Sequence, residues 1–229
     1  MDTEVSAELI DPRGVASGLS IAVVNYDMGI LRSVVHALEF LGCKPRLAGS
    51  AEAIEGCDAI ILPGVGAFGE AMGALERQNL NQSLSEVVTA RKTPFLGICL
   101  GMQLIAKASE EHGHHEGLGW IDGTVRQIDP KNGRVPHVGW NCVAADADDP
   151  LFEGIDPKAS FYFDHSFHVA VNDGARIASV DFGGPMVAAL SSGNLYATQF
   201  HPEKSQRAGL KLLRNFLNIA AAAARRDDA

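Results

Sequence analysis

The pentapeptide Gly97-Ile98-Cys99-Leu100-Gly101 places a cysteine between two glycines, where an apolar run of strand type passes into a segment of helical type. The pattern matches the G-x-S-x-G nucleophile elbow of hydrolases, with cysteine in place of serine. In such a turn the nucleophile has a strained backbone, and side chains at the flanking glycines would crowd the strand and the helix. Free N–H groups at the start of the helix favour the thiolate, which is the attacking form. A buried cysteine in an ordinary turn is the alternative for this pentapeptide alone.

The segment TQFHPEKSQ supplies a base for this cysteine and a group to orient that base. Residues i and i+2 of an extended chain face the same side, so we expect His201 and Glu203 to point together. His201 would carry the proton between Cys99 and the leaving group, and Glu203 would hold the imidazole tautomer. A surface histidine beside a solvated glutamate is the alternative, but the cysteine elbow favours a catalytic triad.

Acyl transfer also needs hydrogen-bond donors for the developing oxyanion. The backbone N–H of Leu100, directly after the nucleophile, is one expected donor. The stretch ILPGVGAF, residues 61–68, predicts a buried strand that opens into a glycine loop, Gly64-Val65-Gly66, and Val65 is the second expected donor. An ordinary glycine-rich turn is the alternative. The loop fits neither the G-x-G-x-x-G dinucleotide pattern nor the G-K-[ST] ending of a P-loop.

These residues need a framework, and the first half of the chain predicts an alternation of buried strands and helices. Strands that alternate with helices imply right-handed crossovers and a mostly parallel sheet with helices on both faces. The expected strands are residues 21–26, 58–63 and 93–99, and the expected helices are residues 31–42, 68–80, 81–92 and 100–110.

The second half predicts short strands separated by Gly, Asn and Asp, and therefore an antiparallel extension of the same α/β domain. SSGN is typical of a hairpin turn. We expect a flexible extension over residues 1–20, one domain over 21–219 and a frayed tail over 220–229. The expected strands are 119–128, 134–145, 160–171, 175–183, 186–193 and 194–203, and a last helix is expected over 205–226.

Composition excludes several classes of function. The net charge of −9 argues against nucleic-acid binding, which needs clustered Lys and Arg. No apolar stretch approaches the roughly 20 residues of a membrane span, and the first residues lack the pattern of a signal peptide. Four scattered cysteines favour a reducing cytoplasm over a disulfide framework. HGHHEG, residues 112–117, predicts a polar surface loop, and the chemistry requires neither a metal nor another cofactor.

Taken together, GICLGMQL and HPEKS resemble the class I glutamine amidotransferases, whose Cys-His-Glu glutaminases release ammonia through a γ-glutamyl thioester. Four further segments, NYDMGILRSV, LPGVGAFGEAM, PHVGWN and YFDHSFH, resemble the glutaminase subunits of imidazole glycerol phosphate synthases of histidine biosynthesis. The resemblance extends from Ile21 to about Leu217. It implies hydrolysis of L-glutamine and a heterodimer with a (β/α)8-barrel cyclase, which receives the ammonia through a channel. The products of that lyase would be imidazole glycerol phosphate and aminoimidazole carboxamide ribotide.

The resemblance also implies roles for individual residues. A glutamine pocket would be formed by residues from four segments, namely Gly64, Gly66, Gln103, Glu111, His165, Ser166 and Phe167. A second group would lie toward the cyclase, namely His137, Trp140, Asn141, Tyr162 and Lys204. Ordinary packing is the alternative for each of them, and His165 in particular has the form of a satisfied core histidine.

The chain departs from the family pattern at a few positions. Asp27 and Ile30 stand where glycine and asparagine are expected, in a segment that resembles an interface element of the family. Asp164 and Phe167 replace an apolar residue and a tyrosine, so the ligand contact of residue 167 is expected through its backbone.

Three other functions are compatible with the elbow. The chain could serve another synthase, for anthranilate or pyridoxal phosphate, and a different partner would then stimulate it. A cysteine peptidase or γ-glutamyl hydrolase would cleave its substrate without a partner. A binding subunit with an inactive site would leave Cys99 unlabelled by a glutamine-like electrophile. The free subunit is expected to be a poor glutaminase, because the Gly64–Gly66 loop could rest with a carbonyl where an N–H is needed.

Overall fold

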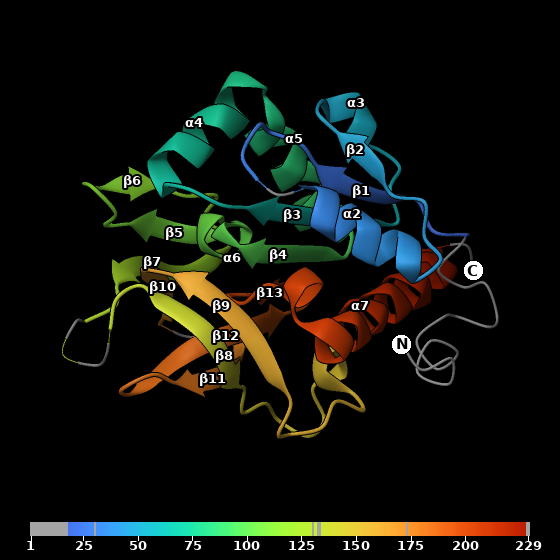
Figure 1. Ribbon diagram of the computed structural model, residues 1–229. Coiled ribbons are helices and arrows are strands. Elements are labelled where there is room, and N and C mark those ends of the chain that lie inside the picture. The colour runs from blue at the N-terminus through green and yellow to red at the C-terminus, as the bar shows by residue number, and fades with distance from the viewer. Residues whose placement is uncertain (1–17, 30, 130, 132–133, 173, 228–229) are drawn as a thin grey trace.

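A seven-stranded mixed sheet forms the centre of the computed structural model, which describes residues 18–29, 31–129, 131, 134–172 and 174–227 (Figure 1). Its strand order is β11-β12-β13-β4-β3-β1-β2. The five strands from β13 to β2 run parallel, and β11 and β12 add an antiparallel edge. The strands are β1 (Ile21–Val24), β2 (Arg46–Ala48), β3 (Ala59–Gly64), β4 (Phe95–Cys99), β11 (Arg176–Asp181), β12 (Pro185–Ser192) and β13 (Leu195–Thr198).

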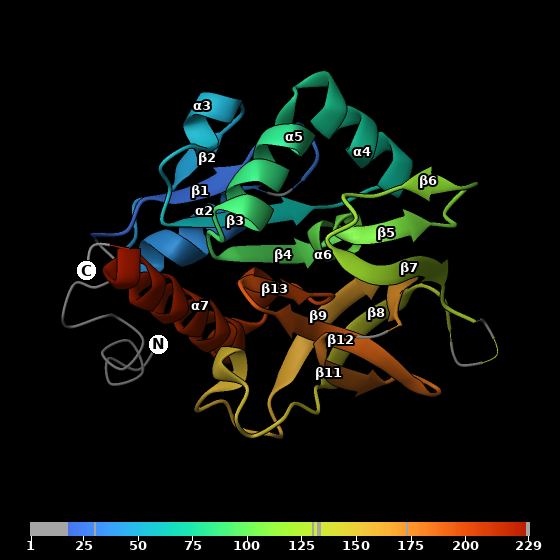
Figure 2. The ribbon, with the colours of Figure 1, turned by 180° about the vertical axis from the view of Figure 1, so that it is seen from behind.

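Helices cover both faces of this sheet (Figures 1 and 2). The strands are buried on both sides, and alternate residues enter two separate cores. Val23 packs into the core beneath α2 and α7, whereas Val24 packs into the core beneath α4 and α5. The expected α/β fold is therefore confirmed. The helices are α2 (Leu31–Phe40), α3 (Ala51–Ile54), α4 (Phe68–Arg77), α5 (Leu80–Ser85) with a π-helical continuation (Glu86–Ala90), α6 (Leu100–Leu104) and α7 (Gln206–Asp227).

Two smaller sheets extend the second half of the domain. A four-stranded sheet has the order β10-β7-β5-β6, and β8 pairs with β9 as an antiparallel ribbon. Figure 2 shows both beside the carboxyl ends of β4 and β13. The members are β5 (Ala106–Ser109), β6 (His115–Glu116), β7 (Ile121–Gln127), β8 (His137–Cys142), β9 (Ser160–His165) and β10 (Phe167–Val171).

The strand expected over 194–203 ends at Thr198, and two further expected elements are wrong. The helix expected over 100–110 ends at Leu104, because Ala106–Ser109 pairs with β7 and β6 as a strand. The single strand expected over 160–171 breaks at Ser166, and its halves β9 and β10 join different sheets. In both places pairing with distant strands decides the structure over the local pattern.

The ends of the chain differ in how far they are described. Of the extension expected over residues 1–20, residues 1–17 lie outside the described part. Helix α7 continues to Asp227 through much of the segment expected to be frayed, and Ala220 and Ala221 are buried. No helix in the described part of the chain combines the length and apolarity that a membrane span requires.

Candidate active site

Cys99 lies at the turn between β4 and α6 in a strained conformation, with φ 53° and ψ −105°. The strand and the helix pack very closely at this turn, and only glycine fits at the two flanking positions. A Cβ on Gly97 would lie 2.7 Å from the Gly101 carbonyl oxygen, and a Cβ on Gly101 would overlap the carbonyl oxygen of Leu62. Both glycines are therefore sterically required, and strain at a buried nucleophile is typical of a functional site.

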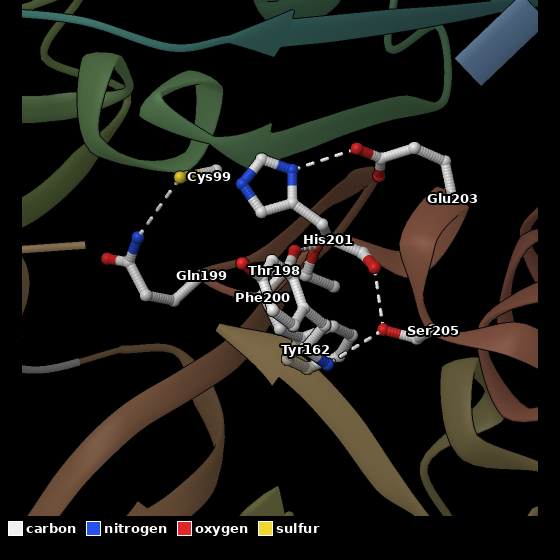
Figure 3. Close-up of polar contacts among 8 residues, drawn as sticks. All are labelled: Cys99, Tyr162, Thr198, Gln199, Phe200, His201, Glu203 and Ser205. Carbon is white, nitrogen blue, oxygen red and sulfur yellow. Dashed lines mark hydrogen bonds and ion pairs between the residues drawn. The ribbon is translucent and has the colours of Figure 1, made fainter. Parts of the chain in front are cut away.

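His201 and Glu203 lie beside this turn as a buried pair. Nδ1 of His201 is 2.8 Å from Oε1 of Glu203, and their side chains are 4% and 2% exposed. The expected extended geometry is wrong, because Pro202–Lys204 forms a 3-10 turn that brings the two groups together. In Figure 3 the imidazole stands between Cys99 and Glu203, with its second nitrogen on the side of the sulfur.

The backbone of His201 is fixed by its neighbours on β9 (Figure 3). The N–H of His201 donates to the Tyr162 carbonyl at 2.9 Å. The hydroxyl of Ser205 donates to the His201 carbonyl at 2.6 Å and accepts from the N–H of Tyr162 at 2.9 Å. The imidazole is thus held on a rigid segment, as a general base requires.

The charge of His201 depends on its two partners. Burial lowers the pKa of His201, but hydrogen bonds and charge interactions with Cys99 and Glu203 outweigh this effect and raise the pKa to about 10. At neutral pH the ring is therefore an imidazolium between sulfur and carboxylate. An imidazolium in this position stabilises the thiolate and can give its proton to a leaving amine.

Gln199 is a contact of Cys99 that the sequence analysis missed. Its Nε2 lies 3.7 Å from the Cys99 sulfur, and its Oε1 accepts from Nε2 of Gln103 at 3.2 Å. The residue is fully buried at the end of β13. A polar side chain two positions before His201 in an apolar strand is the signal that could have identified it.

The Gly64–Gly66 loop follows β3 beside the elbow, and Glu111 anchors its far end. Oε2 of Glu111 accepts a hydrogen bond of 2.6 Å from the N–H of Phe68, the first residue of α4. This carboxylate is 8% exposed and faces the same cavity as Cys99. Glu111 therefore connects the expected glutamine pocket with the loop expected to supply an oxyanion donor.

A cavity of about 810 Å³ opens beside the sulfur and collects most of the expected site residues. Gly64 and Glu203 are not among its lining residues. Pro136, Gln127, Glu110, His112 and Asp164 also line it. The expected residues in the lining are Val65, Gly66, Cys99, Leu100, Gln103, Glu111, His165, Ser166, Phe167 and His201.

His165 reaches this cavity with both ring nitrogens already engaged. Its Nδ1 lies 2.8 Å from the Phe167 carbonyl oxygen, and its Nε2 lies 3.0 Å from Nδ1 of His137. Burial lowers the pKa of His165 to about 3, so the ring is neutral and donates to the carbonyl. The other ring nitrogen of His137, Nε2, lies 2.9 Å from the side-chain Oδ1 of Asn141. Both ring nitrogens of His165 are therefore already used in contacts within the fold.

Of the residues expected to face a partner, Trp140 is exposed and His137 is buried, and the other three, Asn141, Tyr162 and Lys204, are half-buried. Trp140 is 45% exposed and its ring centre lies 5.8 Å from that of Tyr162. The Lys204 ammonium lies 5.6 Å above the Tyr162 ring. His137 is 1% exposed and lies beneath this surface, bonded to Asn141. Asp27, which replaces an expected glycine, has a φ of 65°, and Ile30 lies outside the described residues.

Comparison with known proteins identifies relatives over most of the chain. The family model "Glutamine amidotransferase class-I" matches residues 22–220. Imidazole glycerol phosphate synthase subunit HisH of Rhodospirillum rubrum is 44% identical over 213 residues, covering 88% of this chain and all of the relative. The protein of the same name from Methanothermobacter thermautotrophicus is 43% identical over 202 residues, with 88% of this chain and all of the relative covered.

Solved structures share the fold at lower sequence identity. A putative GMP synthase subunit from Thermoplasma acidophilum superposes with a TM-score of 0.73 at 21% identity, covering 92% of this chain and 98% of that chain. The PurLQS structure from Thermotoga maritima gives a TM-score of 0.70 at 22% identity, covering 88% of this chain and 99% of that chain. These two similarities concern the fold alone.

Proposed function

Because the chain belongs to the class I glutamine amidotransferase family, we propose that it is the glutamine-hydrolysing subunit of an imidazole glycerol phosphate synthase and that Cys99, His201 and Glu203 perform the hydrolysis. The observation that carries the proposal is the strained Cys99 beside the buried His201–Glu203 pair. Identity of more than 40% over nearly the full length of the named relatives supports the assignment to histidine biosynthesis.

The chemistry follows from the order of the three groups. The Cys99 thiolate attacks the side-chain amide carbon of L-glutamine, and the carbonyl oxygen becomes an oxyanion. The His201 imidazolium gives its proton to the amide nitrogen, the C–N bond breaks, and ammonia leaves with a γ-glutamyl thioester behind. His201, now neutral, takes a proton from water, which attacks the thioester and releases glutamate and the thiolate. Glu203 keeps Nδ1 of the ring protonated throughout.

The cavity supports roles for the other residues. Glu111 offers a buried carboxylate to the α-ammonium of glutamine, and the N–H groups of Leu100 and Val65 are the proposed oxyanion donors. Gln103 and the backbone of Ser166 and Phe167 would hold the amino-acid end of the substrate. Gly64 and Gly66 leave the space that the substrate and the loop require.

The partner in this proposal is a (β/α)8-barrel cyclase that forms a heterodimer with this chain. Ammonia in water at neutral pH is mostly ammonium, which is not a nucleophile, so a synthase needs a protected path between its two sites. The cluster of Trp140, Tyr162 and Lys204 supports a docking surface next to His201, since Trp140 is exposed and Trp and Tyr are enriched at interfaces.

Ammonia release from glutamine by the purified chain, with and without a cyclase and its nucleotide, tests the proposal. We expect weak basal turnover, strong stimulation by the cyclase and none in the Cys99→Ala variant. Stimulation by an anthranilate or pyridoxal phosphate synthase partner instead would reassign the chain within the family. Cleavage of peptides or polyglutamates by the free chain would favour the partner-independent hydrolases.

A further inference from the structure

The Tyr26 side chain is fully buried two residues after β1, and its hydroxyl has no hydrogen-bond partner within the described part of the chain. Burial raises the pKa of Tyr26, and the nearby Cys99 raises it further, so the phenol stays protonated at all ordinary pH values. The fold therefore holds an O–H donor without an acceptor. Buried polar groups are nearly always paired, and an exception of this kind calls for an explanation.

The unpaired hydroxyl lies against Gly64, the last residue of β3. A Cβ on Gly64 would overlap the Tyr26 hydroxyl, and it would also come within 3.1 Å of Cβ of Leu100. Gly64 stands opposite Cys99 in the strand pairing and opens the loop that contains Val65. Glycine is required here because the phenol occupies the space of a side chain.

The strand pairing fixes the direction of the Gly64 carbonyl. The N–H of Ile60 donates to the Pro94 carbonyl on the β4 side, and the register continues unbroken to Gly64. In a parallel pair every second residue bonds to the same neighbour, so Leu62 and Gly64 also face β4. The Gly64 carbonyl is thereby directed toward β4, the strand that leads through Cys99 to Leu100.

We propose that Tyr26 is a positioning residue for the Gly64–Gly66 loop. When the Gly64–Val65 peptide turns over, the Gly64 carbonyl turns away from β4 and accepts a hydrogen bond from the Tyr26 hydroxyl. The same rotation aims the Val65 N–H at the cavity that Leu100 also lines. This inference rests on the proposed glutaminase function and adds a residue outside the cavity lining to it.

The segment around Tyr26 and the loop pack closely enough for such coupling. A Cβ on Gly29 would lie 3.4 Å from Cα of Gly64, and a Cβ on Gly66, whose φ is 107°, would lie 3.0 Å from Cε of Met28. The Gly64 carbonyl gains a hydrogen bond from the hydroxyl in the rotated loop. The hydroxyl therefore lowers the free energy of the turned loop relative to the resting one.

Tyr26→Phe tests this role, with Tyr196→Phe as a matched control, since Tyr196 lies in the core beneath α7 against Phe216. In the complex with the cyclase and its nucleotide, we expect Tyr26→Phe to lower kcat for glutamine about 3- to 10-fold, the effect of one neutral hydrogen bond. The KM should stay within about twofold. Alkylation of Cys99 by iodoacetamide, followed by mass spectrometry, should be unchanged, because that displacement forms no oxyanion.

Thermal unfolding separates this role from a structural one. Removal of an unpaired buried hydroxyl should leave the Tm of Tyr26→Phe equal to or above that of the wild type. An unchanged stimulated kcat in Tyr26→Phe, or a loss of kcat accompanied by a lower Tm, would overturn the inference. If wild-type protein instead shows no glutaminase activity with any synthase partner, the proposed function itself fails, and the two failures are thus distinct.

Discussion

Nδ1 of His201 and Oε1 of Glu203 are 2.8 Å apart, and both side chains are almost completely shielded from solvent. The carboxylate therefore fixes one ring nitrogen as a donor and leaves the other for Cys99. Its second oxygen, Oε2, has no hydrogen-bond partner among the described residues. A single hydrogen bond thus holds the pair. A substitution of Glu203 can therefore remove its catalytic effect without a large change in the fold.

Replacement of Glu203 by glutamine should reduce the stimulated kcat by about 10²- to 10⁴-fold, because the amide no longer stabilises an imidazolium or selects its tautomer. The KM for glutamine should change little, since Glu203 does not line the cavity. Steady-state ammonia release in the presence of the cyclase measures both constants. A variant that retains more than about a tenth of the wild-type kcat would remove Glu203 from the triad.

The pKa of His201 should be near 10 in the free chain and lower in both Cys99→Ala and Glu203→Gln, since each partner stabilises the charged ring. Titration of nitrogen-15-labelled histidine by NMR measures it directly. The direction in which pH changes the free energy of unfolding follows from this shift, because the folded-state pKa lies above the unfolded value near 6.5. The contribution of His201 to the free energy of unfolding is complete below about pH 6.5 and is lost as the pH rises toward 10. A titration midpoint near 6.5 in the wild type would contradict this coupling.

Gly101→Ala should destabilise the protein by about 1–3 kcal/mol or more and abolish turnover, because the new Cβ would overlap the Leu62 carbonyl oxygen on β3. Gly193→Ala is a useful comparison, since Gly193 has open space around it and a φ of 61°, so the cost there is one of backbone conformation alone. Chemical denaturation compares the two variants. Equal stability of Gly101→Ala and wild type would show that the elbow is not packed as described.

The sequence was informative wherever the residues that perform the chemistry lie close together in the chain. Glycines two positions either side of Cys99 predict the elbow, because the steric requirement lies within five residues. His201 and Glu203 are also near neighbours, and their pairing was predicted although the backbone between them is a 3-10 turn and not a strand. Sequence spacing therefore placed the groups correctly even where it gave the wrong local conformation.

What the sequence did not reveal depends on contacts between distant segments. Gln199 is 100 positions from Cys99, and only the pairing of β13 with β4 brings its amide to the sulfur. The end of α6 at Leu104 was missed because strand pairing with β7 overrides the helical pattern of the following residues. The contact of Tyr26 with Gly64 likewise requires β1 and β3 to be neighbours.

Glu111 should show two separable roles in substitution. Glu111→Gln keeps an oxygen for the N–H of Phe68 but loses the negative charge, so the KM for glutamine should rise about 10- to 100-fold with a smaller change in kcat. Glu111→Ala removes both the charge and the oxygen that accepts from Phe68. This variant should therefore also have a lower kcat, because the loop before α4 is no longer anchored. Steady-state kinetics of the two variants in the complex separate the roles. Identical kinetics of Gln and Ala variants would exclude a role in holding the loop.

Trp140→Ala should weaken the complex with the cyclase about 30-fold or more, the effect of losing one central aromatic contact of about 2 kcal/mol. The side chain is 45% exposed, so the fold should tolerate the change and the Tm should stay near that of the wild type.

Leu47→Ala is the matched control, because Leu47 is 53% exposed on the edge strand β2, far from β8 (Figure 1). Calorimetric titration of the cyclase into each variant gives the Kd. Because a weaker Kd leaves less of the chain in the complex, stimulation should fall at subsaturating cyclase and be recovered at saturation. Unchanged affinity in Trp140→Ala, or equal weakening in Leu47→Ala, would place the docking surface elsewhere.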